Sequence, residues 1–275
     1  MLAKNGSLRQ DTLNLLYSHQ FMKIQNPGSC LIFAHRGANR EAADNTRAAF
    51  NKALNYPIDG METDVQLSRD GIPVLWHDRF LNKLGHPWKH IDDFDYAQLE
   101  QMNFARHFSS SAEPEGVLSL KEFLDTYRGR CRLQIEIKNR DWEQPHRHES
   151  KIKQCIDLIG DPREHGIFIS CFNLASMIFA DQYAPGFPLY YALKEHHTQT
   201  DIEGFLKEHE FLQGLCMPIA ILTDAIIERL RNNGKGIVTY TCNSNEEITH
   251  ALNFGVDVLI TDFPQKALQI RSARN

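Results

Sequence analysis

The chain lacks several features that mark common protein classes. Its 275 residues carry Lys+Arg 30 against Asp+Glu 35, a formal net charge of -5, so no basic excess is available to hold a nucleic-acid backbone. No apolar run approaches the roughly 18 residues of a membrane-spanning helix, and the first residues lack the apolar core of a signal peptide. We therefore predict no nucleic-acid partner, no stable membrane insertion and a cytoplasmic location.

Paired cysteines, linkers and nucleotide-binding loops are also missing. The six cysteines are widely spaced without a Cys-x-x-Cys pair, which favours buried thiols in a reducing compartment. No tract rich in Pro, Gly or Ser divides the chain, so we expect one domain at 29–275 after a polar N-terminal extension at 1–28. Neither a Gly-x-Gly-x-x-Gly motif nor a P-loop supports an open, doubly wound nucleotide-binding sheet.

Eight short apolar runs alternate with amphipathic stretches from residue 31 onward. Nearly continuous hydrophobicity is typical of parallel strands buried on both faces, and the intervening helical spacing predicts crossover helices. Eight such alternations favour a closed (β/α)8 TIM barrel. The predicted strands are residues 31–35, 60–67, 133–138, 167–172, 188–193, 214–219, 237–242 and 258–263. Helical spacing is clearest at residues 46–54, 120–127, 174–183, 224–233 and 246–254.

One further apolar run does not fit a parallel barrel. Residues 72–78 follow the second strand after only a short turn, so they should form an extra antiparallel strand. A two-residue Asp70-Gly71 loop would place His77 opposite Asp64, and the period of two puts Glu62 on the same face. The long segment after this hairpin, about residues 79–117, is predicted to be an insertion. It serves either as a lid or binding loop or as a surface excursion with no role.

Ionisable side chains stand at the carboxyl ends of the first three predicted barrel strands, where TIM barrels place their active sites. Glu62, Asp64 and Glu136 would converge there and repel one another unless a cation joined them. Because the ligands are carboxylate oxygens without clustered thiolates, we expect a divalent metal, Mg²⁺ or Ca²⁺, rather than zinc.

Four more residues of these strand ends suit phosphate chemistry. Arg36 and Lys138 beside a metal would concentrate positive charge on a phosphate. His35 and His77 can act as general base and general acid near neutral pH. The combination predicts a metal site that promotes displacement at a phosphate, whereas each motif alone is common in proteins of other kinds.

A series of short motifs runs through residues 31–264 in a set order. The motifs are AHRGA, DNTRAAF, METDVQLSRDGIPVLWHD, LSLKEFL, LQIEIKN, ISCF, TYTCN and GVDVLITDFP. In this order the chain resembles the glycerophosphodiester phosphodiesterase family. The resemblance implies a (β/α)8 barrel with a small insertion after the hairpin, a divalent metal, and hydrolysis of glycerophosphodiesters to sn-glycerol 3-phosphate and an alcohol.

The resemblance also assigns site roles. It makes Glu62, Asp64 and Glu136 the metal ligands, His35 and His77 the acid/base pair, and Arg36 and Lys138 the phosphate contacts. It suggests recycling of glycerophosphodiesters from lipid turnover, which joins lipid metabolism to glycerol metabolism.

Three places depart from the family's usual motifs. Asp44 replaces a glutamate, which retracts a candidate inner-shell carboxylate by about one C–C bond, ~1.5 Å; a helix N-cap is the alternative role for Asp44 or Asn45. Tyr240-Thr241 replaces Trp-Thr, and residues 82–84 read Asn-Lys-Leu in place of Arg-Thr-Thr. The last two changes concern the side that binds the alcohol.

Aromatic and histidine residues outside these motifs give weaker signals. Phe172 and Tyr240, with Trp88 and Trp142, are candidates for a substrate pocket that binds a quaternary ammonium headgroup, with core or rim packing as the default. Four further histidines, in polar surroundings, are predicted to lie in solvated loops rather than to form a second metal site. They are His146, His148, His196 and His197. For Cys242 we expect buried packing.

Several alternatives stay open at this point. The substrate can be a lysophospholipid cleaved in the sense of phospholipase D, or the barrel can bind phosphate without catalysis. The attacking group is either water or the glycerol 2-hydroxyl, and either histidine can be the base. Headgroup preference and oligomeric state are not set by the sequence.

Overall fold

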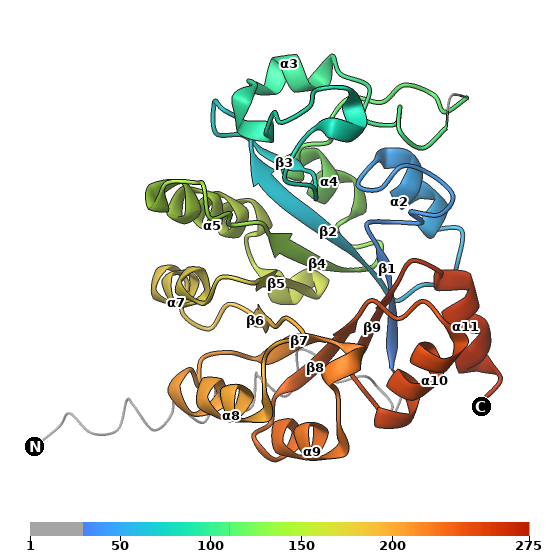
Figure 1. Ribbon diagram of the computed structural model, residues 1–275, viewed down its shortest axis with the longest axis vertical. Coiled ribbons are helices and arrows are strands. Elements are labelled where there is room, and N and C mark those ends of the chain that lie inside the picture. Colours follow the sequence, from blue (N-terminus) through green and yellow to red (C-terminus); the bar gives the residue numbers. More distant parts are fainter. Residues whose placement is uncertain (1–29, 110, 275) are drawn as a thin grey trace, which may run out of the picture.

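The computed structural model describes residues 30–109 and 111–274, so the predicted N-terminal extension at 1–28 lies outside the described residues. Eight parallel strands form a closed barrel, because β1 is hydrogen-bonded to both β2 and β9 (Figure 1). The predicted TIM barrel is confirmed, and each strand lies within two residues of its predicted range. The barrel strands are β1 (Leu31–His35), β2 (Gly60–Leu67), β4 (Arg132–Ile137), β5 (Ile167–Cys171), β6 (Leu189–Ala192), β7 (Gly214–Pro218), β8 (Gly236–Tyr240) and β9 (Val258–Thr261).

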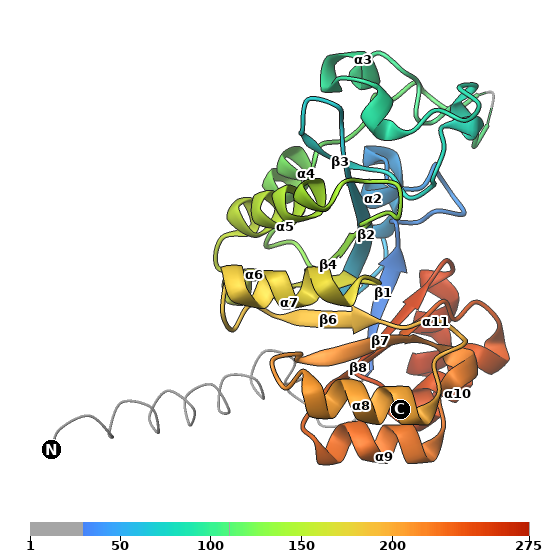
Figure 2. The same ribbon diagram turned by 60° about the vertical axis from the view of Figure 1, so that its left-hand side comes forward.

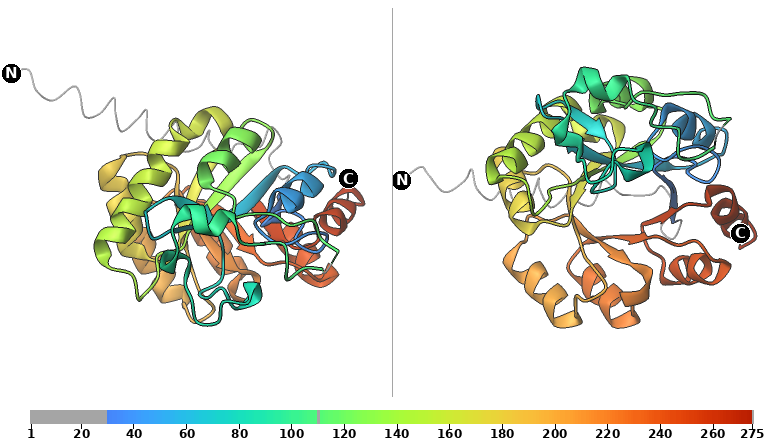
Figure 3. Two further views of the ribbon diagram at one scale, coloured as in Figure 1. Left: turned by 90° about the horizontal axis from the view of Figure 1, so that it is seen from above. Right: turned by 45° about the horizontal axis from the view of Figure 1, so that its top comes forward.

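Helices form a ring around these strands (Figure 3). Most of their amino ends carry a side-chain cap; for example, the Ser119 hydroxyl accepts from the backbone N–H of Glu122, and the Glu122 side chain accepts from the Ser119 N–H in return. The five segments with clear helical spacing are helices as predicted. The ring comprises α2 (Arg47–Ala53), α4 (Leu120–Tyr127), α5 (Pro145–Ile159), α6 (Pro162–His165), α7 (Leu174–Tyr183), α8 (Gln199–Glu208), α9 (Asp224–Asn232), α10 (Asn245–Phe254) and α11 (Pro264–Ser272).

Helix α5 corrects one prediction. His146 and His148 were expected in a solvated loop, but both lie in the first turns of α5. Pro145 occupies the first helical position, where its missing N–H costs nothing. The apolar residues that anchor this helix come later in it, at Ile152, Cys155, Ile156 and Ile159, all buried. The polar first turns therefore show no apolar periodicity from which a helix could be predicted.

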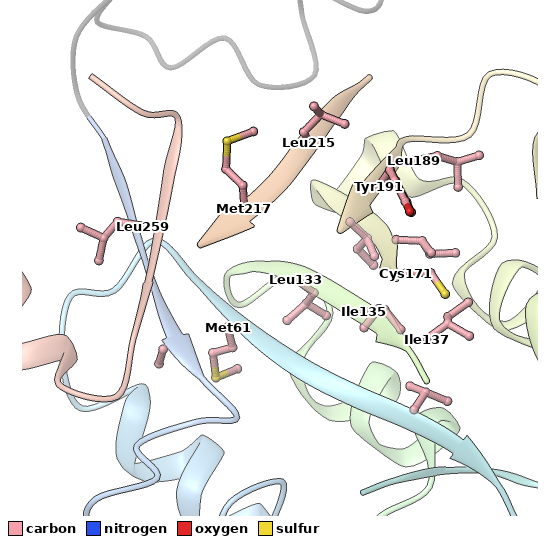
Figure 4. Close-up of a cluster of buried hydrophobic side chains, with 14 of the residues drawn as sticks. Met61, Leu133, Ile135, Ile137, Cys171, Leu189, Tyr191, Leu215, Met217 and Leu259 are labelled. Atoms are coloured by element: carbon pink, nitrogen blue, oxygen red, sulfur yellow. The ribbon is translucent and has the colours of Figure 1, made fainter. Parts of the chain in front are cut away.

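Two apolar layers fill the molecule. Outward-facing strand side chains such as Leu133, Ile135 and Leu215 pack against the helices (Figure 4), and Cys242 belongs to this layer with no exposed surface, as predicted. Inward-facing side chains fill the barrel itself with Leu31, Phe33, Phe168, Tyr190, Ala192, Cys216, Val238, Val258 and Ile260. The interior is therefore packed, and only the ends of the strands can present polar groups to a ligand.

Two glycines make room for the largest of the inward-facing rings. A Cβ at Gly214 would lie 2.3 Å from the Tyr190 ring, and one at Gly236 would lie 2.4 Å from the Tyr190 hydroxyl. Both distances are far below van der Waals contact, so any larger residue would displace the tyrosine.

The extra strand β3 (Pro73–Leu75) pairs antiparallel with β2, as predicted, but in a different register. Ser68 and Ile72 close a three-residue loop, in which Gly71 has a left-handed φ of 84°. The partner of Asp64 is therefore Trp76, whose N–H donates to the Asp64 carbonyl at 3.1 Å. The prediction that His77 lies opposite Asp64 is wrong, because a three-residue loop moves every pair by one position.

The segment between β3 and α4 forms a cap at the end of the molecule toward which β2 runs (Figures 1 and 2). It contains η1 (Asn82–Leu84), η2 (Ile91–Asp93) and α3 (Tyr96–Glu100). Its own apolar cluster consists of Val74, Trp76, Leu81, Leu84, Ile91, Leu99, Phe104 and Val117. In the described part of the chain, no helix is long and apolar enough to cross a membrane.

Candidate active site

The alternation of side chains along the strands builds the candidate site. In β1 the inward positions are Leu31 and Phe33, and the next inward position is His35; in β9 they are Val258 and Ile260, followed by Asp262. The same two-residue step places Glu62 and Asp64 within β2, at and just beyond the level of His35, and Glu136 and Lys138 at the end of β4. The ionisable side chains of the candidate site therefore lie directly above the apolar side chains that fill the barrel.

Three carboxylates meet at this level. Asp64 and Glu136 are register partners in the parallel strands β2 and β4, and Glu62 lies two residues before Asp64 on the same face. Ligand oxygens of Glu62, Asp64 and Glu136 lie within 4.8 Å of one another. Glu62 is 2% exposed and Asp64 is 1% exposed, so water screens their mutual repulsion poorly.

The surroundings of the Glu62 carboxylate indicate that the three carboxylates suit a bound cation. Its Oε2 accepts the Arg36 N–H at 3.2 Å, but its Oε1 is buried without a hydrogen-bond partner among the described residues. Burial, with the neighbouring charges of Asp64 and Glu136, raises the pKa of Glu62 well above its ordinary value. A divalent ion would supply the missing partner, and an all-oxygen donor set without thiolates suits Mg²⁺ or Ca²⁺.

Arg36 and Lys138 flank the same carboxylates. Arg36 Nε lies 2.9 Å from Asp64 Oδ2, and Lys138 Nζ lies 2.8 Å from Asp64 Oδ1 and also contacts Glu136. Although burial favours the neutral acid, these two cations hold the pKa of Asp64 well below its usual range. Asp64 is therefore a full negative charge between two positive ones.

Asn45 fixes the orientation of Asp64. Its amide donates to Asp64 Oδ2 at 2.9 Å and its carbonyl accepts from the Thr63 hydroxyl at 2.7 Å. The N-cap of α2 is instead Thr46, whose hydroxyl accepts from the Ala49 N–H. The alternative role of Asp44 or Asn45 as a helix cap is therefore wrong, since the helix begins one residue later.

His35 is held by a carboxylate from the far end of the chain. Its Nδ1 lies 2.6 Å from Asp262 Oδ1, which also accepts from Asn39 at 2.6 Å. A carboxylate only accepts, so Nδ1 carries the proton and Nε2 is left as the acceptor, 3.9 Å from Glu62 Oε2. Burial and the charge of Arg36 lower the pKa of His35, while Asp262 opposes them. Neutral His35 can therefore accept a proton through Nε2.

Asp262 is expected to act through His35. An Asp262→Asn variant should lower kcat about 10- to 100-fold with little change in KM, because the imidazole loses the partner that fixes its tautomer. The pKa of His35 should fall, so the acidic limb of the pH–rate profile should move to lower pH. A profile that keeps its position, with kcat within about twofold of the parent, would contradict this role.

His77 has a carboxylate partner of its own. It lies just beyond β3, and its Nδ1 is 2.9 Å from Asp78 Oδ1, which again leaves Nε2 for another partner. Its backbone carbonyl accepts from Arg140. His77 lines the same cavity as Lys138 and is one of the groups that lower the pKa of Asp64.

Asp44 lies to one side of the three carboxylates and is not part of that group. Its Oδ2 is 3.3 Å from Arg36 Nη1, and its Oδ1 is 3.1 Å from His107 Nε2, which comes from the segment between β3 and α4. Lys83 of the same segment is 4.0 Å away. Burial would raise the pKa of Asp44, but the hydrogen bond from His107 and the charges of Lys83 and Arg36 lower it.

The aromatic candidates occupy different places. Phe172 and Tyr240 pack edge to face at the barrel mouth with ring centroids 6.0 Å apart, and the Tyr240 hydroxyl donates to the Leu193 carbonyl. Trp142 lies on the loop before α5, whereas Trp88 is 73% exposed on the cap. The structure thus brings Phe172 and Tyr240 together and leaves Trp88 outside.

Sequence reasoning missed two residues of this site. Asp262 follows the last strand in the same inward phase as Val258 and Ile260, so the alternation could have identified it. His107 lies in an irregular segment, where no periodicity marks which side chain reaches the barrel. Only the folded chain brings it to Asp44.

These features define a TIM barrel with three clustered carboxylates, two carboxylate-paired histidines and the cations Arg36 and Lys138 at its mouth. Residues 35–266 match the model of the Glycerophosphoryl diester phosphodiesterase family. The chain is 30% identical over 248 residues to a glycerophosphodiester phosphodiesterase of Bacillus altitudinis, covering 87% of this chain and 97% of that protein. It therefore belongs to the glycerophosphoryl diester phosphodiesterase family, which confirms both the resemblance and the predicted enzyme class, a phosphoric diester hydrolase.

Solved structures agree on the fold. A putative glycerophosphoryl diester phosphodiesterase from Silicibacter pomeroyi DSS-3 superposes with a TM-score of 0.81 at 20% identity, covering 94% of this chain and 97% of that one. A phosphodiesterase of Oleispira antarctica, solved with its product sn-glycerol-3-phosphate, gives a TM-score of 0.78 at 24% identity, covering 88% of this chain and 96% of that one.

Proposed function

We propose that the chain hydrolyses glycerophosphodiesters to sn-glycerol 3-phosphate and an alcohol, with Mg²⁺ or Ca²⁺ held by Glu62, Asp64 and Glu136. The observation that carries the proposal is the buried carboxylate of Glu62, which lacks a partner for one oxygen at the centre of a charged cluster. Family membership and the phosphate-suited cations beside this cluster support the same substrate class.

In this proposal each remaining residue has one task. Arg36 and Lys138 bind the phosphate oxygens, and a divalent cation held by Glu62, Asp64 and Glu136 would supply further positive charge beside them. Of His35 and His77, one removes a proton from the attacking oxygen and the other protonates the leaving oxygen. Trapping a five-membered cyclic phosphate by rapid quench would identify the glycerol 2-hydroxyl as the attacking group, whereas its absence favours water.

The test of this function is release of sn-glycerol 3-phosphate from purified protein. Glycerophosphoglycerol, glycerophosphoethanolamine and glycerophosphocholine are incubated with Mg²⁺, with Ca²⁺ and with chelator. Metal-dependent release is expected. If no diester is cleaved with either metal, the proposed function fails, and lysophospholipid cleavage and phosphate binding without turnover become the hypotheses to measure next.

Asp44 is proposed to hold Arg36 rather than the metal. An Asp44→Ala variant should raise KM for the diester about 5- to 10-fold, because the guanidinium loses one of its two carboxylate partners. The dissociation constant of the metal, measured by calorimetry, should change less than about threefold. A loss of metal affinity greater than about tenfold would instead identify Asp44 as an inner-shell ligand.

The cellular setting is proposed from composition and thiols. All six cysteines are free, and Cys131 is the one that is not fully buried, as expected in a reducing compartment. A cytoplasmic enzyme that recycles diesters from lipid turnover is consistent with this. Labelling of intact cells with a thiol reagent that cannot cross membranes should leave Cys131 unmodified.

A further inference from the structure

A cavity of about 1020 Å³ opens beside the candidate reaction centre. His77, Lys138 and Phe172 form the part of its wall nearest the carboxylates, and from there it extends over the loop between β4 and α5 to α7. A phosphodiester carries two ester groups, and the glycerol group is small and the same in every glycerophosphodiester. A cavity of this size therefore suits the group that varies, the leaving alcohol.

The loop that lines this cavity is held by a buried lysine. Lys151 has no exposed surface, and its Nζ donates to the Lys138 carbonyl at 2.6 Å and to Glu143 Oε1 at 2.8 Å. Glu143 Oε2 in turn accepts from the Arg140 N–H at 2.8 Å, while the Arg140 side chain donates to the His77 carbonyl. The wall is thus preorganised and connected to the candidate acid/base histidine.

The aromatic rings of the wall are already in contact with protein cations. The guanidinium carbon of Arg79 lies 4.4 Å from the centre of a Trp142 ring, and His90 stacks on Trp142 at 4.5 Å. Lys138 Nζ lies 5.7 Å from the Phe172 ring. A quaternary ammonium group binds by resting on such faces, so it would have to displace these side chains.

The carboxylates of the wall do not offer an alternative site for a cation. Glu143 is engaged by Lys151, and Asp141 is 81% exposed and 3.7 Å from Arg79. Glu149, the remaining acid, is exposed on α5. Within the described residues, no acidic side chain of the wall is therefore both buried and unpaired.

Positive charge faces the cavity instead. Arg79 and Arg140 belong to its wall, and a guanidinium donates hydrogen bonds to ligand oxygens. Lys194 adds a further positive charge to the wall. Such a surface recognises hydroxyl, carboxylate or phosphate oxygens.

We infer that this cavity binds the leaving alcohol and selects an oxygen-rich alcohol without positive charge, such as glycerol or inositol, over choline and ethanolamine. The inference rests on the proposed function, because a leaving alcohol exists only if the diester is cleaved. It is also an alternative to the hypothesis of a quaternary ammonium pocket formed by Trp88, Trp142, Phe172 and Tyr240, for which core or rim packing is the default.

The test compares kcat/KM for glycerophosphoglycerol and glycerophosphoinositol with kcat/KM for glycerophosphocholine at one metal concentration. The first two should exceed the third by about tenfold or more. Arg79→Met removes the cation that covers the Trp142 ring, and Lys194→Met removes a charge; each should reduce this ratio about 3- to 10-fold. Lys121→Met is the matched control, because Lys121 pairs with Asp125 on α4 and is outside the cavity wall.

The possible results distinguish a failure of this inference from a failure of the proposed diester hydrolysis. If glycerophosphocholine is cleaved as efficiently as the polyol diesters, or if Arg79→Met and Lys194→Met leave the ratio unchanged, the inference is overturned while the proposed function stands. If no diester is cleaved with either metal, both are overturned.

Discussion

Replacing Glu62 by Gln is expected to lower kcat at least about 10³-fold and, in the same protein, to raise the stability of the metal-free form. The amide removes a buried charge that Asp64 and Glu136 repel and that has no partner on Oε1. It also removes one carboxylate oxygen from the proposed metal site, so the affinity for Mg²⁺ or Ca²⁺ should fall with activity. A purely structural glutamate would not change stability and activity in opposite directions.

The gain in stability should depend on pH in a defined direction. The folded-state pKa of Glu62 is raised above the ordinary value of 4.5, so the unfolded chain loses its proton first as the pH rises. Ionisation therefore costs the folded state nothing well below pH 4.5, and the cost grows as pH rises toward the folded-state pKa. In metal-free protein the difference in Tm between Glu62→Gln and the parent should be largest near neutral pH and should vanish on acidification.

A matched control is Glu203→Gln on the outer surface of α8, where the carboxylate pairs with Arg229. Thermal unfolding with and without metal and steady-state kinetics are measured for both variants. The control should keep its activity and its stabilisation by metal. If Glu62→Gln is stabilised by metal as strongly as the parent, the carboxylate group is not the metal site.

Removing either imidazole is expected to lower kcat about 10²- to 10⁴-fold. Each histidine has its Nδ1 fixed by a carboxylate, His35 by Asp262 and His77 by Asp78, which leaves Nε2 as the atom that exchanges protons. The variants His35→Asn and His77→Asn remove proton transfer with a small change of volume. Metal affinity is measured in parallel, since His35 is 3.9 Å from Glu62.

A second substrate assigns the two roles. A glycerophosphodiester whose leaving group is a phenol of low pKa needs no proton on departure. It should restore most of the lost rate in the variant that lacks the acid, and little in the variant that lacks the base. If both variants keep more than about a tenth of the parent kcat on the ordinary diester, neither histidine is the acid or base.

Much of the fold could be predicted because it is encoded in local patterns. Short apolar runs separated by amphipathic stretches marked all eight barrel strands, since parallel strands are buried on both faces. Helix α5 was not predicted, because its first turns, around His146 and His148, are polar and its apolar residues come later. The hairpin register was wrong because Arg69, Asp70 and Gly71 form the loop, and one added loop residue moves every pair along the two strands.

Part of the candidate site could likewise be predicted from local sequence patterns, and part could not. By itself, the sequence determined the barrel and the convergence of Glu62, Asp64 and Glu136, because a two-residue period and a strand end are local properties. Only the tertiary structure decided that Asp262 orients His35, which lies 227 residues away along the chain, because closure of β1 against β9 creates that contact. It likewise decided that His107 reaches Asp44 and that Arg140 holds His77. The alternation along β9 could have placed Asp262 at the barrel mouth, but which side chain it contacts depends on how distant segments pack. For His107 and Arg140 no periodicity indicates the contact at all.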